Sequence, residues 1–345
     1  MSRIQYDENM EIAAAINKPD VQFYNVDDEP FSIHGVWRDG ESYCRVPREV
    51  AERVSKGIYE SRKNCAGGRV RFKTDSPYVA IKVEYGVYEC STITPNVAMV
   101  GFDMYADDCF AGAFRPPVIF EGEDLASVVE LGEAKERVIT INMPLYAEVK
   151  KLLVGVASGS KISHAPRYKH EKPIVFYGSS ITNGAAASRP GATYTARLSR
   201  MLDSDYHSLG FGGLAKGEPA FAEYIAGLDM SVFVLDYDHN APTLEHLTNT
   251  HEPFFKAVRE KNPDLPIVII SRPNIGPLVE ERFEIIKATY DNAIAGGDKN
   301  VYLIKGIDLL AEGELDFTAD KTHPSDLGFY FMAKGIYPTL KSIFE

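Results

Sequence analysis

Residues 174–184, with the sequence IVFYGSSITNG, decide the fold of the C-terminal half of the chain. Four apolar residues with strand character end at Gly178, two serines follow, and a helical pattern begins soon afterwards. Ser180 is therefore expected on a tight turn at the carboxyl end of a buried strand, where open α/β sheets bind their ligands. A serine hydroxyl in that position can act as a nucleophile if a base reaches it.

The chain that follows Pro173 alternates between short apolar runs and helical patterns. Strands are expected at 174–177, 206–209, 232–236, 267–271 and 301–304. Helices are expected near 193–203, 218–228, 243–261 and 278–294, with a last one at 325–344. Such an alternation predicts an α/β fold with a parallel sheet covered on both faces. Right-handed crossovers make it a doubly wound, three-layer α/β/α domain.

The N-terminal half reads as mostly β. Alternating apolar and polar residues predict strands at 79–85 and 138–143, and turn sequences separate such runs. One helix is expected, from Arg48 to Arg62. This pattern predicts an all-β sandwich or jelly roll. The segment 157–173 is polar and contains Gly, Ser and Pro, so the sequence predicts a β-rich accessory domain at 1–165 and a catalytic domain at 166–345.

A candidate base and its orienting partner follow the fifth predicted strand. Asp320 precedes His323 by three residues, and an aspartate at that spacing can accept the Nδ1–H of the imidazole. The other ring nitrogen is then free to take the proton of Ser180. Because both segments lie at the carboxyl ends of parallel strands, they are expected to share one crevice. The sequence therefore predicts a Ser180–His323–Asp320 triad.

Two other strand ends offer donors for an oxyanion. Three glycines within 210–213 let backbone N–H groups approach a ligand, although this loop has neither the dinucleotide-binding nor the phosphate-loop pattern. Asn240, after the third strand, offers a side-chain amide, but an Asx turn before Pro242 would explain it equally well. The candidate oxyanion donors are Ser180, Gly213 and Asn240. Arg189, Arg272 and His239 are candidate substrate-binding residues.

Composition narrows the range of partners. The formal net charge of −12 disfavours nucleic acid or an anionic membrane as a partner. The N-terminus has no apolar segment of the signal-peptide type, so a cytoplasmic protein is expected. The four cysteines lack metal-site spacing and are expected to be buried thiols, although two disulfides stay conceivable: Cys44, Cys65, Cys90 and Cys109. No metal or cofactor is expected.

These blocks together resemble the SGNH (GDSL-type) hydrolase superfamily. The segment 178–182 resembles its first block, with Ser180 as nucleophile, and Gly213 matches the glycine of its second block. Asn240 matches the asparagine of the third block, and Asp320 with His323 matches the fifth. The resemblance implies a flavodoxin-like α/β/α domain that hydrolyses esters. Ser179 departs from the family pattern, in which aspartate precedes the nucleophile.

The third block also departs from the family, because residues 236–240 read DYDHN where Gly-x-Asn-Asp is usual. In the N-terminal half, residues 101–105 read GFDMY and are similar to the Gly-x-Asp-Leu-Tyr motif of one SGNH subgroup. The resemblance thus extends over the whole chain. It implies a serine esterase that acts on acyl esters, acetyl esters of a carbohydrate first among them, with a small-molecule or oligosaccharide ester as the partner.

Two other functions stay open at this point. The same triad would serve an acyltransferase, from which only the exclusion of water distinguishes an esterase. A non-catalytic carbohydrate-binding protein on an SGNH scaffold is the alternative from another class. The β-rich region could bind the saccharide, cover the crevice or form the dimerisation surface of a homo-oligomer.

Overall fold

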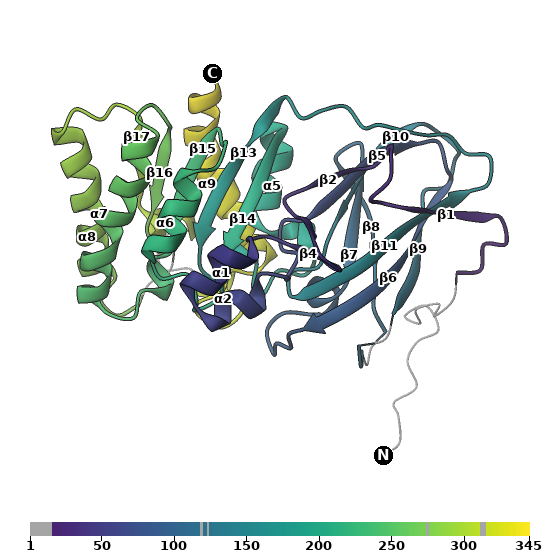
Figure 1. Ribbon diagram of the computed structural model, residues 1–345, viewed down its shortest axis with the longest axis horizontal. Coiled ribbons are helices and arrows are strands. Elements are labelled where there is room, and N and C mark those ends of the chain that lie inside the picture. Colours follow the sequence, from purple (N-terminus) through teal and green to yellow (C-terminus); the bar gives the residue numbers. More distant parts are fainter. Residues whose placement is uncertain (1–15, 118–119, 123, 274–275, 311–314) are drawn as a thin grey trace, which may run out of the picture.

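The computed structural model describes residues 16–117, 120–122, 124–273, 276–310 and 315–345, and Figure 1 shows a β-rich half beside an α/β half. The β-rich half contains two antiparallel sheets. The first has the order β1 (Val21–Asn25), β11 (Ala147–Ala157), β6 (Tyr78–Tyr88), β9 (Leu125–Glu130). The second has the order β12 (Ile162–Ser163), β5 (Arg69–Thr74), β10 (Arg137–Asn142), β7 (Phe102–Ala106), β8 (Cys109–Phe114), with β2 (Ser32–His34) also paired to β5.

The two sheets share one apolar core, to which alternate residues of each strand contribute. On β6, Val79, Ile81 and Val83 are buried in that core, whereas Lys82 and Glu84 on either side of Val83 are exposed. Val70 and Phe72 of β5 face the same core. The predicted β-sandwich is therefore confirmed. The alternation of apolar and polar residues that predicted its strands also places the apolar side chains in the core.

The helix predicted from Arg48 to Arg62 is two helices, α1 (Arg48–Val54) and α2 (Lys56–Ser61). The break is at Ser55, whose backbone is extended and whose hydroxyl accepts a hydrogen bond from the Ile58 N–H. Serine is among the residues that cap helix N-termini best, and this cap restarts the helix. A two-stranded hairpin, β3 (Trp37–Asp39) with β4 (Ser42–Cys44), precedes the pair, and the short α3 (Asn96–Met99) follows later.

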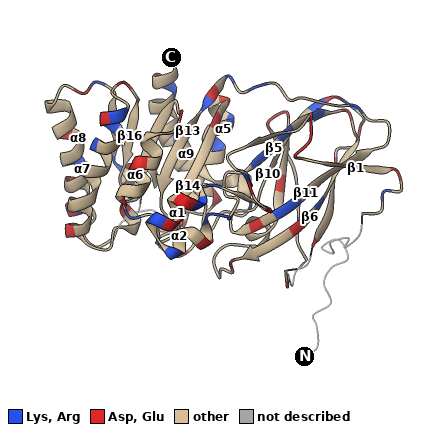
Figure 2. Ribbon diagram, viewed as in Figure 1, with Lys and Arg blue, Asp and Glu red and all other residues tan. Residues whose placement is uncertain are grey.

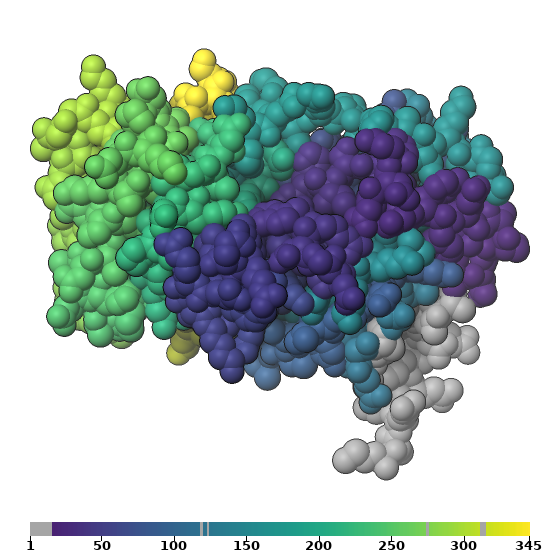
Figure 3. Space-filling view, viewed as in Figure 1, coloured from purple at the N-terminus to yellow at the C-terminus, as the bar shows by residue number. Residues whose placement is uncertain are grey.

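The pair α1–α2 packs against the other half of the molecule. Ala51 and Ile58 are buried in the same apolar cluster as Val175 and Phe221 of the α/β half. Figure 3 shows these early residues, in purple and dark blue, crossing from one half to the other. The sandwich strands end at Ser163 and the parallel sheet begins at His170. The division into 1–165 and 166–345 stays a prediction, since the two halves share this helix pair.

The α/β half has a five-stranded parallel sheet, and its order matches the flavodoxin-like 2-1-3-4-5 arrangement. The order is β14 (Ser204–Gly210), β13 (His170–Gly178), β15 (Val232–Asp236), β16 (Ile267–Ile270), β17 (Val301–Ile304). One face packs against α5 (Tyr194–Leu202) and α9 (Asp326–Phe344), the other against α6 (Pro219–Ala226), α7 (Leu244–Lys261) and α8 (Val279–Ala295). Short 3-10 turns lie at Pro190–Ala192, Asp238–Asn240, Gly306–Leu310 and Leu315–Phe317. The predicted three-layer domain is confirmed.

Charged residues of both signs are interspersed along both halves, as Figure 2 shows. The expectation of four buried thiols is wrong for two of them, because Cys90 and Cys109 are exposed. All four cysteines are free. Burial raises the pKa of Cys44 to about 11 and that of Cys65 to about 12, so neither is a reactive thiolate at neutral pH.

Candidate active site

Ser180 lies at the carboxyl end of β13, where the strand turns directly into the short helix α4 (Ser180–Asn183). The preceding Ser179 caps this helix by accepting a hydrogen bond from the Ile181 N–H. Gly178 makes the turn possible, because a Cβ at that position would collide with Thr182 Oγ1. The turn leaves Ser180 half-exposed at the point where the strand order reverses, which is where the ligand sites of such sheets lie.

The structure brings the three predicted triad residues together. Ser180 Oγ lies 2.8 Å from His323 Nε2, and His323 Nδ1 lies 2.8 Å from Asp320 Oδ2. The backbone N–H of His323 also donates to the same carboxylate, at 2.8 Å. Burial works to raise the pKa of Asp320, but these hydrogen bonds from His323 outweigh it and the pKa is lowered. The carboxylate is therefore charged and holds the imidazole with Nε2 toward the serine.

The predicted oxyanion donors are arranged differently from the expectation. The Ser180 N–H begins α4, and the first N–H groups of a helix have no acceptor within it. The Gly213 N–H, however, donates to Asn240 Oδ1 at 2.9 Å. The amide nitrogen of Asn240 donates to the carbonyls of Phe211 and Ala215, at 2.8 and 2.9 Å. Asn240 therefore ties the 211–215 loop together, and its donors are not open to a ligand in this arrangement.

Gly212, which the sequence did not single out, lies directly beside Ser180. A Cβ on Gly212 would lie 3.2 Å from the Cβ of Ser180, a tighter approach than side chains ordinarily make. The glycine therefore lets the 211–215 loop pass directly beside the serine. The cluster of glycines indicates such a loop, but it does not indicate which glycine lies beside Ser180.

Arg189 connects the two halves, and its substrate-binding role stays a prediction. Its guanidinium lies 3.4 Å from Asp103 and 3.6 Å from Asp326, and it stacks on the ring of Phe110 at 4.1 Å. Asp103, from the GFDMY segment, is fully buried and accepts hydrogen bonds from Asn142 Nδ2 and from the Gly191 N–H. Burial raises the pKa of Asp103, although these donors and the charge of Arg189 oppose the shift.

The contacts of the 188–191 loop extend to the segment of His323 through α9. The N–H and the hydroxyl of Ser188 both donate to the carboxylate of Asp326, the first residue of α9. His323 precedes that helix by three residues, and Ser325 caps it. The GFDMY segment of the sandwich thus holds the 188–191 loop, and this loop holds the start of the helix that follows His323.

Arg272 and His239 lie beside the charged residue Asp238. Arg272 donates its backbone N–H to Asp238 Oδ2 at 2.9 Å, and its guanidinium lies 3.6 Å from the same oxygen. Arg282 donates to the other oxygen of that carboxylate at 2.6 Å. His239 is half-buried in the 3-10 turn that contains Asp238. The contacts of Arg272 explain it as an ion-pair partner, so its substrate-binding role stays a prediction, as does that of His239.

Asp236, at the end of β15, is a buried carboxylate directly beneath α4. It accepts hydrogen bonds from Thr182 Oγ1 at 3.0 Å and from the Tyr194 hydroxyl at 2.8 Å. Burial raises its pKa to about 7, and the two donors lower it only in part. Sequence reasoning placed Asp236 on a strand but assigned it no role. Its contacts show that it fastens the helix that carries Ser180.

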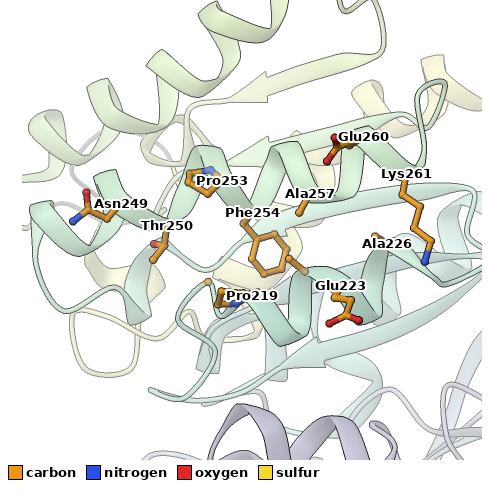
Figure 4. Close-up of a pocket in the computed structure, with 12 residues that line it drawn as sticks. Pro219, Glu223, Ala226, Asn249, Thr250, Pro253, Phe254, Ala257, Glu260 and Lys261 are labelled. Atoms are coloured by element: carbon orange, nitrogen blue, oxygen red, sulfur yellow. The ribbon is translucent and has the colours of Figure 1, made fainter.

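No group of three or more His, Cys, Asp or Glu side chains that could hold a metal ion occurs among the residues described. Within the same residues, no helix combines the length and apolarity needed to cross a membrane. A mostly apolar cavity of about 550 Å³ lies between α6 and α7 and not at the triad (Figure 4). Its labelled lining residues include Pro219, Pro253 and Phe254.

The chain resembles known proteins in both of its halves. A family model described as GDSL-like lipase/acylhydrolase matches residues 171–341. A second one, for the N-terminus of SGNH-hydrolase-type esterases, matches residues 21–162. A crystal structure described as a GDSL-like lipase from Bacteroides ovatus ATCC 8483 is 30% identical, with a TM-score of 0.83, covering 94% of this chain and 98% of the other. Among curated proteins, none matches the chain.

Two less similar structures share the fold of the whole chain. A salicylyl-acyltransferase from a tetracycline biosynthetic pathway is 20% identical, with a TM-score of 0.78, over 95% of this chain and 99% of the other. An acetyl xylan esterase from the rumen bacterium Butyrivibrio proteoclasticus is 14% identical, with a TM-score of 0.63, over 94% and 100%. With the family matches over both halves, the chain belongs to the GDSL-like lipase/acylhydrolase family, as an SGNH hydrolase with the family's β-rich N-terminal domain.

Proposed function

We propose that this SGNH hydrolase is an esterase that removes short acyl groups, acetyl first among them, from a carbohydrate. Ser180 is the nucleophile, His323 the general base and Asp320 the residue that orients the base. The observation that carries the proposal is the continuous pair of 2.8 Å contacts from Ser180 Oγ through the imidazole to Asp320. Ser180, from one segment of the chain, and His323 with Asp320, from another, are aligned there as nucleophilic catalysis requires.

The reaction follows from this alignment. Ser180 Oγ attacks the ester carbonyl while its proton passes to His323 Nε2, and the tetrahedral intermediate forms. The imidazolium, stabilised by Asp320, then gives this proton to the departing sugar oxygen, which leaves an acyl-serine. Water, deprotonated by the same imidazole, attacks the acyl-serine and releases the carboxylic acid. Each half-reaction forms one C–O bond and breaks one.

The oxyanion of the intermediate needs donors beside Ser180. The Ser180 N–H is the donor whose position favours this role without rearrangement. Gly213 and Asn240 can contribute only if they exchange their mutual hydrogen bond for one to the oxyanion. We therefore assign Asn240 first to the shape of the 211–215 loop, and the oxyanion role of Gly213 and Asn240 stays a prediction.

The exposure of the triad to solvent favours a substrate in which the ester is carried by a large polar molecule. The side chains of His323 and Asp320 keep 19% and 32% of their surface exposed. A substrate can present a small acyl group at such a rim while its remaining mass stays outside. Two of the similar structures are named family two carbohydrate esterases and another is named an acetyl xylan esterase, which supports a saccharide.

Acyl transfer is the second candidate, and the similar salicylyl-acyltransferase is the observation that favours it. The triad residues would be the same in that reaction. Hydrolysis is the better proposal, because water reaches the exposed histidine and hence the acyl-serine. A purely binding role is disfavoured by the aligned hydrogen bonds, which binding does not require.

Labelling with a fluorophosphonate probe, followed by peptide mass spectrometry, tests the proposal directly. We expect the label on Ser180, and acetate release from acetylated xylo-oligosaccharides as well as from p-nitrophenyl acetate. The same assay with alcohol acceptors separates transfer from hydrolysis by the products formed. A chain that takes no label and releases no acid from any ester would contradict the proposal.

A further inference from the structure

A cavity of about 220 Å³ lies where the segment that links the two halves crosses β2 and β5. Its walls include Ser32, His34, Arg71, Tyr168 and Asp205. Asp205 belongs to the start of β14, at the opposite end of the parallel sheet from Ser180. The nine residues of the neighbouring β13 span about 26 Å, so the cavity is remote from the triad. We call it the linker pocket.

Arg71 in this pocket is a buried cation without an anion. Only 7% of its surface is exposed. Within the described parts of the chain, its guanidinium has no hydrogen-bond acceptor and no carboxylate partner, and its Nε is buried without any polar contact. What it contacts is the ring of Tyr168, 3.9 Å away. A buried charge ordinarily finds a partner, because removing it from water is otherwise unfavourable.

The other buried arginines of the described chain show what is ordinary for this protein. Each one donates to oxygen: Arg45 to the carbonyls of Ser208 and Gly210, Arg62 to Asp39, Arg69 to Asp205 and Arg282 to Asp238. Arg71 lies two residues from Arg69 on the same face of β5, and Arg69 pairs with Asp205, which lines the pocket. The lack of an acceptor is therefore particular to Arg71.

The carboxylates in the pocket do not compensate Arg71. Burial works to raise the pKa of Asp205, but the hydrogen bond from His34 and the charge of Arg69 outweigh it and keep this residue ionised. Its negative charge is thus shared by Arg69 and His34. Glu171, at the rim, pairs with Arg167 at 3.1 Å. After these pairs are formed, one positive charge remains, and it is that of Arg71.

The geometry around Arg71 is suited to a small anion. A guanidinium that stacks on a ring keeps its N–H groups in its own plane, where they match two oxygens of a carboxylate, phosphate or sulfate. Ser32 is the cross-strand neighbour of Arg71 and lines the same pocket, so its hydroxyl is a second donor. A volume of 220 Å³ exceeds that of one water molecule, about 30 Å³, several-fold.

We propose that the linker pocket binds a small oxyanion, a phosphate, sulfate or carboxylate group, on Arg71 with Ser32 as the second donor. The bound anion supplies the charge that the described chain lacks there. Because Arg71 of the sandwich stacks on Tyr168 of the linker, the bound anion lies beside the contact that joins these two segments. The site is separate from the ester-cleaving triad and does not depend on the proposed function.

The test compares the full chain with Arg71→Gln in sodium phosphate, sulfate and acetate, each against chloride at the same ionic strength. We expect a saturable rise in Tm of the unaltered chain with at least one of these anions, and a matching Kd by calorimetry. Arg71→Gln should bind that anion at least about tenfold more weakly. Arg53→Gln, which removes a charge from an exposed ion pair elsewhere, is the control and should respond like the unaltered chain. Phosphate or sulfate acting alone indicates a tetrahedral ligand, and acetate a carboxylate.

A second variant keeps the proposal testable if Arg71→Gln does not fold. Ser32→Glu places a carboxylate opposite Arg71, so it should raise Tm without added anion and lose the anion response. Ser32→Gln adds the same bulk without charge and should not raise Tm. The proposal is overturned if the unaltered chain shows no saturable response to any of the three anions up to about 50 mM. It is equally overturned if Arg71→Gln or Ser32→Glu responds as strongly as the unaltered chain.

Discussion

The triad and the contacts that hold it in place differ in origin and in exposure to water. Ser180, His323 and Asp320 are all partly exposed, and their hydrogen bonds stay within the α/β half. The two carboxylates beneath them, Asp103 and Asp236, are buried, and Asp103 comes from the sandwich. We call these two residues and their hydrogen-bond partners the buried support. The difference teaches that the reacting groups lie where substrate and water reach them, whereas their positions depend on polar groups that water does not reach.

Removal of the nucleophile should give the largest effect on the exposed side of this comparison. Ser180→Ala is expected to lower kcat by about 10⁶, as the loss of a triad serine does elsewhere. The Tm of this variant should hardly change, because the Ser180 side chain is half-exposed and its hydrogen-bond partner is the partly exposed His323. Ser179→Ala is the matched control: it should keep most of the turnover but lose about 1 kcal/mol of stability with the helix cap. Activity that survives in Ser180→Ala would end the assignment.

On the buried side, Asp103→Ala should reduce both stability and turnover. The change leaves Asn142 and the Gly191 N–H without their acceptor and Arg189 without one of its carboxylates. We expect a cost of about 3 kcal/mol in the free energy of unfolding. A shift of the 188–191 loop would also displace the start of α9, so kcat should fall about 10²-fold with little change in KM.

Asp103→Asn separates geometry from charge at this site. The amide keeps one acceptor oxygen and the same size, so most of the kcat should return while part of the stability loss remains. Measuring kcat and KM on p-nitrophenyl acetate, with urea unfolding in parallel, distinguishes the cases. If Asp103→Ala unfolds more easily but turns over at the original kcat, the sandwich does not position the triad.

The sequence could predict the exposed part because its signals are local. An apolar run that ends at Gly178 and an aspartate three residues before a histidine are readable without coordinates. The rule that parallel strands end at one edge then brings Ser180 and His323 together. The α1–α2 pair shows the limit of such signals. An apolar stripe predicts a buried helix face, but it does not say which of two cores receives it.

The buried support could not be predicted, because it depends on which charges meet across the fold. Arg189 is a candidate ligand-binding cation in the sequence, and only the position of Asp103 shows that it also forms an ion pair between the two halves. Asn240 was matched by its place after a strand. Whether its amide faces a ligand or the carbonyls of Phe211 and Ala215 depends on the backbone path of the 211–215 loop, which no motif specifies.

Asn240→Ala should therefore reduce stability and turnover together. It leaves two buried carbonyls and the Gly213 N–H without their partner, which is expected to cost about 2 kcal/mol in the free energy of unfolding. The loosened loop passes beside Ser180 at Gly212, so kcat should fall as well. Urea unfolding and kcat measured on the same samples test this. A drop of about 10² to 10³ in kcat without any loss of stability would instead identify Asn240 as an open oxyanion donor.

The dependence of stability on pH also separates the two sides. The pKa of Asp320 is lowered by its hydrogen bonds with His323, whereas burial raises the pKa of Asp236 to about 7. Between about pH 4 and 7, Asp236 therefore keeps its proton in the folded chain. In the unfolded chain its pKa is 3.8, so there it has lost the proton over this pH range. Its contribution to stability is complete below about pH 4 and is lost as the pH rises to about 7.

Asp236→Asn tests this sign, because an amide accepts from Thr182 and Tyr194 but does not titrate. Between pH 4 and 7, the free energy of unfolding of the unaltered chain should fall relative to that of the variant, by at most about 1.4 kcal/mol per pH unit. Urea midpoints at several pH values measure the difference between the two proteins, in which other titrating groups cancel. A difference that stays constant over this range would mean that Asp236 is already ionised in the fold. The helix that carries Ser180 would then be fastened by a charge and not by a neutral acid.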